Sequence, residues 1–167
     1  MDDIQIKEAF RYGLLSTLNN WRVWLGDDEL RAIHIGFDST NTEIAISLLT
    51  DKEPYLAEHN IDPFDESNGG WPTADWRLTC VNKSSKHGFP DARELLDWMK
   101  TESRRLFDEP DAVEKISAMD DRLRGLFFSA ATSEEIKSML QRFRRVSRPL
   151  KIRVQNWFDE IPLEAEL

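Results

Sequence analysis

Cysteine, glycine and long apolar runs are scarce in this chain of 167 residues, which has one cysteine, Cys80, and 7 glycines. A single cysteine excludes an intrachain disulfide and a metal site built from cysteines. No apolar run approaches the roughly 20 residues that span a bilayer. The N-terminus, MDDIQIKEAF, has acids where a secretory signal peptide has bases. We therefore expect a cytoplasmic protein without membrane contacts.

Positive charge is also in short supply. The chain has 22 Lys and Arg against 31 Asp and Glu, which gives a net charge of −9. Because contact with phosphates requires an excess of bases, this balance argues against a nucleic-acid partner. An acidic surface instead favours basic protein partners.

Recognisable catalytic motifs are absent as well. The sequence has no phosphate-binding glycine loop, no nucleophile elbow and no H-E-x-x-H pair. His34, His59 and His87 are scattered, and we expect no bound metal and no cofactor. One alternative stays open, in which His59, Asp62 and Asp65 line the pocket of an enzyme or a ligand-binding domain.

Hydrophobic periodicity predicts the elements of the first half. Residues 2–21 carry apolar side chains at helical spacing, with Asp2 or Asp3 available as the N-cap. From Leu30 the period changes to two, which predicts a hairpin whose turn lies at 38–41. A third strand is expected at 75–82, where Trp76 would lie in the core.

The second half is predicted to be helical. Helices should begin near Pro90, Pro110 and Thr132, and the last of them should end at Pro149. The remaining tail could form a short strand or helix. The order of a helix, then strands, then helices indicates one α+β domain over residues 1–167. We expect a small antiparallel sheet of about three strands or more, flanked by an N-terminal helix and a C-terminal helical segment.

The long link between the second and third predicted strands is a candidate binding segment. Residues 51–66 hold six acids against one base, and Trp71 follows two glycines just before Pro72. A loop of this length inside a domain is often functional. Trp71 could be a lid packed over the sheet edge, or an aromatic anchor in a partner site, the kind of residue that dominates binding energy. The predicted partner-binding residues are Trp71, Asp62, Asp65, Glu66 and Glu58.

A basic segment offers a further alternative. Seven bases and two acids lie between residues 134 and 153. On a single helix these bases would form a solvated face, or a patch for a nucleic-acid-associated factor on a basic helix at 137–153. No aromatic platform is interleaved with them before Trp157.

The spacing W-x-x-x-x-W at 71–76, after the helix and hairpin, resembles a group of uncharacterised bacterial domains considered alongside immunity proteins of polymorphic toxin systems. The similarity covers residues 30–50 and 71–83. It implies a small acidic α+β protein that binds and neutralises a toxin domain, and it transfers no catalytic residues. The resulting prediction is a non-enzymatic protein-binding domain whose partner is a basic toxin.

Overall fold

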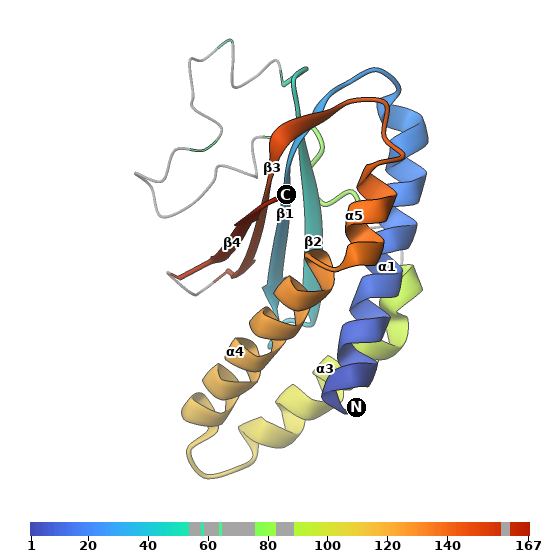
Figure 1. The fold of residues 1–167 in the computed structure, drawn as a ribbon. Helices are drawn as coiled ribbons and strands as arrows, with labels where there is room; N and C mark the ends of the chain where they lie inside the picture. Colours follow the sequence, from blue (N-terminus) through green and yellow to red (C-terminus); the bar gives the residue numbers. More distant parts are fainter. Residues whose placement is uncertain (54–57, 59–63, 65–75, 83–88, 158–160) are drawn as a thin grey trace.

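Four α-helices lie on one side of a four-stranded sheet in the computed structural model, which describes residues 1–53, 58, 64, 76–82, 89–157 and 161–167 (Figure 1). The predicted α+β fold class is confirmed. No described helix is both long enough and apolar enough to cross a membrane. The elements are α1 (Asp3–Leu25), β1 (Leu30–Asp38), β2 (Glu43–Thr50), the 3-10 helix η2 (Pro90–Ala92), α3 (Arg93–Phe107), α4 (Ala112–Ala131), α5 (Glu134–Leu140), β3 (Val146–Asn156) and β4 (Leu163–Glu166).

Helix α1 begins at the expected cap. The Asp2 carboxylate accepts a hydrogen bond from Gln5 N at 2.8 Å, and the Gln5 side chain accepts one from Asp2 N at 3.0 Å. This reciprocal capping box satisfies two backbone donors that have no partner within the helix. The buried stripe consists of Ile6, Phe10, Leu14 and Leu18.

The predicted turn between β1 and β2 is also present. The Asp38 carboxylate accepts hydrogen bonds from Thr40 N at 2.9 Å and from Asn41 N at 3.1 Å. A buried aspartate of this kind fixes the turn by replacing a backbone acceptor. The turn sets the register in which Ile35 of β1 faces Ile46 of β2.

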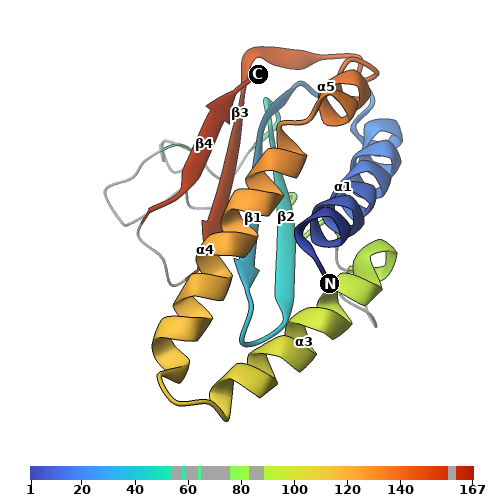
Figure 2. The same ribbon diagram turned by 60° about the horizontal axis from the view of Figure 1, so that its bottom comes forward.

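The sheet is mixed, which corrects the prediction of an antiparallel sheet. The strand order is β2-β1-β3-β4, and β1 runs parallel to β3 while the two outer pairs are antiparallel. Parallel neighbours require a crossover rather than a hairpin. Here α3, α4 and α5 lie between β2 and β3 in the chain and make that return over one sheet face (Figure 2).

Strand β3 replaces the predicted end of the last helix. Helix α5 ends at Leu140, nine residues before Pro149, although Phe143 continues the helical spacing. Pro149 lies where the register with β1 shifts, between Leu30↔Val146 and Ala32↔Lys151. Because proline cannot donate to a ladder, it is tolerated in a strand at such an irregularity.

The predicted third strand at 75–82 does not form. Only one isolated bridge joins Leu78 to Leu48, and Cys80 has a φ of 51°. A left-handed residue interrupts the extended conformation, so the alternation from Trp76 to Cys80 stops there. Trp76 is nevertheless buried at 2% exposure, as expected, beside Ala32 and Leu49 on the sheet face away from the helices.

The main core lies between the helices and the sheet. The ring of Phe127 on α4 stacks on Phe10 of α1 with centroids 4.2 Å apart, and it meets Phe37 of β1 edge-on at 5.3 Å. Three elements therefore share one aromatic contact. The strands contribute Ile33, Ile35, Phe37, Ile44, Ile46, Leu48, Ile152 and Val154 to this core.

Candidate functional site

Most of the predicted partner-binding residues lie outside the described part of the chain. This applies to Trp71, Asp62, Asp65 and Glu66, and also to His59 of the alternative pocket. Glu58 is described and exposed. The proposal of an acidic binding loop at 51–66 therefore stays a prediction.

The first acids of that link have structural roles. Asp51 accepts a hydrogen bond from Glu29 N at 2.8 Å and forms an ion pair with Arg145 at 3.4 Å. Glu53 is buried and accepts a hydrogen bond from Arg77 N at 2.7 Å. These carboxylates hold the end of β2, so they do not belong to a free acidic surface.

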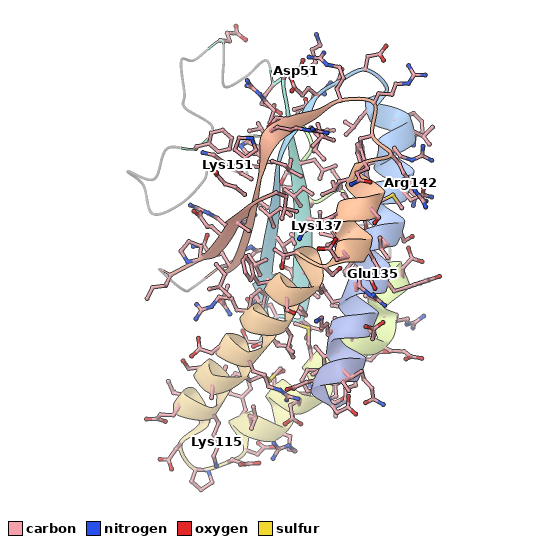
Figure 3. The ribbon with its side chains drawn as sticks, in the orientation of Figure 1. Asp51, Lys115, Glu135, Lys137, Arg142 and Lys151 are labelled. Carbon is pink, nitrogen blue, oxygen red and sulfur yellow. The ribbon has the colours of Figure 1, made fainter. Side chains whose placement is uncertain are left out.

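The bases at 137–153 do not form one helical face, which corrects the basic-helix hypothesis. They are divided among α5, the turn that follows it and β3, as Lys137, Arg142 and Lys151 illustrate (Figure 3). Several of the bases are paired with acids, as in Lys137–Glu134 (2.8 Å), Arg144–Asp27 (3.0 Å), Arg145–Glu29 (3.2 Å) and Arg153–Glu164. Lys151 lies over the Phe64 ring, with Nζ 4.0 Å from the centroid. Phosphate binding would have to compete with these contacts.

A polar row crosses all four strands on the sheet face away from the helices. The strand registers align Ser47 of β2 with His34 of β1, His34 with Arg153 of β3, and Arg153 with Glu164 of β4. Ser47, His34 and Arg153 are buried, and Arg153 forms an ion pair with the half-exposed Glu164. Burial of a guanidinium is costly unless a carboxylate and hydrogen bonds compensate, so this pair is a structural requirement of the face.

His34 is unsuited to acid–base chemistry at neutral pH. Burial and then the nearby charge of Arg153 lower the pKa of His34 to about 4, whereas a hydrogen bond with Gln155 acts in the opposite direction. The imidazole is therefore neutral under ordinary conditions. Among the described residues, no three His, Cys, Asp or Glu side chains are grouped so that they could hold a metal ion.

The turn between α3 and α4 forms a projecting tip that sequence reasoning did not select. The α3–α4 hairpin extends past the β1–β2 turn in both views (Figures 1 and 2). We define the tip as residues 107–114. Its apolar residues point outward, because Phe107 is 56% exposed and Val113 is 80% exposed.

Acidic residues adjoin these apolar residues in the sequence. The tip contains four acids and no base, and Lys115 follows it at the start of α4 (Figure 3). Glu109 forms ion pairs with Arg105 and, at 2.8 Å, with Lys115, which ties α3 to α4. The other three carboxylates are exposed and form no ion pair with a described base: Asp108, Asp111 and Glu114. The run F-D-E-P-D-A-V-E between two predicted helices was the available sequence signal.

A cleft of about 670 Å³ lies between α5 and the start of β3. Its polar lining includes Lys137, Gln141, Ser147, Arg148 and Glu166. The bases and the acid leave the cleft without one dominant sign of charge. Its geometry therefore does not indicate a ligand class.

Comparisons with known proteins add no family to this description, because no protein-family model matches the chain and no curated protein or solved structure matches it significantly.

Proposed function

We propose that this protein is a non-enzymatic binding domain for a basic protein, and that it acts as an immunity-type protein that neutralises a toxin domain. The observation that carries the proposal is the tip, where exposed Phe107 and Val113 occur in one short segment with four acids and no base. Apolar anchors supply most of the free energy of association at interfaces. Carboxylates around them steer a partner of opposite charge and exclude partners of the same sign.

The net charge of −9 supports the same class of partner. At physiological salt the field of exposed charges acts over about 8 Å, so the carboxylates at the tip contribute more to steering than distant acids do. The buried, neutral His34 and the paired bases of β3 and its neighbours serve the fold. Residues 107–114 combine two exposed apolar side chains with four acids and no base.

Site-specific photo-crosslinking in the native cell tests this proposal. A photoreactive residue is placed at Val113, and a matched control is placed at Ser129, which is also exposed on α4. The two positions are 16 residue steps apart, which corresponds to roughly 24 Å along a helix. We expect the probe at 113, but not at 129, to capture a protein rich in Lys and Arg. Capture of acidic proteins, or equal capture at both positions, would contradict the proposal.

The immunity role is tested separately with the captured partner. The partner produced alone should arrest growth, and co-production of this protein should restore it. Replacement of both Phe107 and Val113 by Ser should abolish the rescue while the protein stays folded. Growth arrest that persists despite binding would refute neutralisation and leave only the binding function.

A further inference from the structure

The two edge strands of the sheet differ in whether their outward N–H and C=O groups have hydrogen-bond partners. On β2, Leu48 N donates to Leu78 O at 2.9 Å, and Ile46 O accepts a hydrogen bond from Val81 N at 2.7 Å. The Asn82 side chain bonds Ile46 N and Ile44 O as well. Four outward backbone groups of Ile44, Ile46 and Leu48 are therefore occupied, and this stretch of the β2 edge is closed to another strand.

The β4 edge is different. Leu167 exchanges two backbone hydrogen bonds with Leu150, at 2.9 and 3.0 Å. In an antiparallel pair such bonded positions alternate, so Leu163 and Ala165 also direct their backbone groups toward β3. The N–H and C=O groups of Glu164 and Glu166 consequently point away from the sheet. Within the described part of the chain, no backbone group pairs with them.

The side chains along this edge have a defined pattern. Glu164 and Glu166 are exposed and lie on the sheet face away from the helices, in register with Arg153 and Lys151. Ala165 is half-buried and lies on the helix side, opposite Ile152. A strand added beside β4 would thus place every second side chain next to a carboxylate, and the residue between them next to an apolar surface.

We infer that β4 accepts an extended segment of a basic protein as a fifth strand, in which Lys or Arg alternates with apolar residues. Main-chain hydrogen bonds would provide the attachment, and the two glutamates would select the charge of the added strand. The inference uses a different surface from the tip and does not depend on the function proposed for it.

A second copy of the chain is the competing occupant. Pairing of β4 with its own copy would place Glu164 and Glu166 of one chain beside the same residues of the other. Like charges on neighbouring strands destabilise the pair. Charged side chains on an edge strand are a common means of preventing such self-association. The same charges attract a basic strand.

The experiment uses the full chain and the peptide acetyl-KVKVKVK-amide. NMR titration should show saturable binding, with slowed amide exchange at Glu164 and Glu166. Three control peptides carry one change each: N-methylation of alternate residues to remove the donors of one edge, a blocked KKKKVVV order, and Glu in place of Lys. Each control should bind at least about threefold more weakly, which corresponds to the loss of a few cross-strand contacts.

A charge reversal identifies the edge directly. Glu166→Lys should weaken binding of the alternating peptide by about three- to tenfold, whereas Glu94→Lys, the same charge change on exposed α3, should alter it less than about twofold. Glu164 is left unchanged because it forms the ion pair with buried Arg153. The inference would be overturned if the N-methylated or the blocked peptide bound as tightly as the alternating peptide, or if the slowed amide exchange lay away from β4. Dimerisation of the free protein at pH 7 would also overturn it.

Discussion

The side-chain amide of Asn82 stands in for a peptide unit beside Ile46. Its Oδ1 accepts a hydrogen bond from Ile46 N at 2.7 Å, and its Nδ2 donates one to Ile44 O at 2.9 Å. Asn82 is buried, and the two backbone groups point out of the sheet where no neighbouring strand lies. The Asn82 side chain therefore satisfies two outward backbone groups at the edge of β2.

Removing this amide should be costly. Asn82→Ala leaves a donor and an acceptor unsatisfied, so we expect the free energy of unfolding to fall by about 2–4 kcal/mol. Asn82→Asp keeps the acceptor but directs an oxygen at Ile44 O, and it should also destabilise the fold. Urea denaturation is the measurement, and Asn19→Ala, at an exposed position of α1, is the matched control. Equal midpoints for Asn82→Ala and Asn19→Ala would contradict this account.

The stability of the protein should depend on the protonation of His34. Its pKa is about 4 in the folded protein and about 6.5 in the unfolded chain, so the unfolded state binds more protons between these pH values. The free energy of unfolding should therefore fall as the pH drops from 6.5 to 4. At pH 5 this group should account for a loss of about 2 kcal/mol relative to pH 7.

The variant His34→Gln isolates that contribution, because His59 and His87 remain in both proteins. Urea denaturation at pH 7 and pH 5 should show a smaller pH-dependent loss in the variant, by about 2 kcal/mol. Parallel pH dependences for the two proteins would show that His34 titrates normally in the fold.

Replacement by alanine should change the stability of the protein in opposite directions at two helical glycines. A Cβ at Gly125 of α4 would meet no atom within 4 Å, so Gly125→Ala should stabilise the protein by about 0.5–1 kcal/mol. A Cβ at Gly13 of α1 would lie 2.5 Å from Phe89 Cζ, whose ring is buried. Gly13→Ala should thus destabilise by about 1–3 kcal/mol through overpacking. Thermal unfolding of both variants checks the prediction, and shifts of the same sign would refute it.

Two tryptophans provide a second contrast. Trp76 is 2% exposed, and Trp76→Ala should lower the free energy of unfolding by about 3–5 kcal/mol. Trp24 is 80% exposed, and Trp24→Ala should change it by less than about 0.5 kcal/mol. Chemical denaturation followed by circular dichroism avoids reliance on tryptophan fluorescence. A comparable loss in both variants would mean that Trp24 packs against the protein in solution.

Short-range patterns predicted the elements whose contacts are local. Spacings of three and four residues identified the buried face of α1, and Asp2 was recognised as a possible cap because a capping box spans only three residues. Alternation identified the inward faces of β1 and β2, and the turn at Asp38 joined them. The candidate tip had a local signal too, in the acidic run between two helices, but its exposure depends on how the hairpin projects.

The sequence by itself determined the α+β class, the hairpin, the burial of Trp76 and the acidic balance, because periodicity and composition report which face of an element is apolar. Only the tertiary structure decided that Ile35 pairs with Val154 in a parallel ladder, since partners so far apart in the chain leave no local signal. The same holds for Arg144, Arg145 and Arg153, whose charges are compensated by Asp27, Glu29 and Glu164 from other elements. It also holds for the two edges of the sheet. Only the fold places Asn82 against β2, and only the fold makes β4, which carries Glu164 and Glu166, the other edge strand.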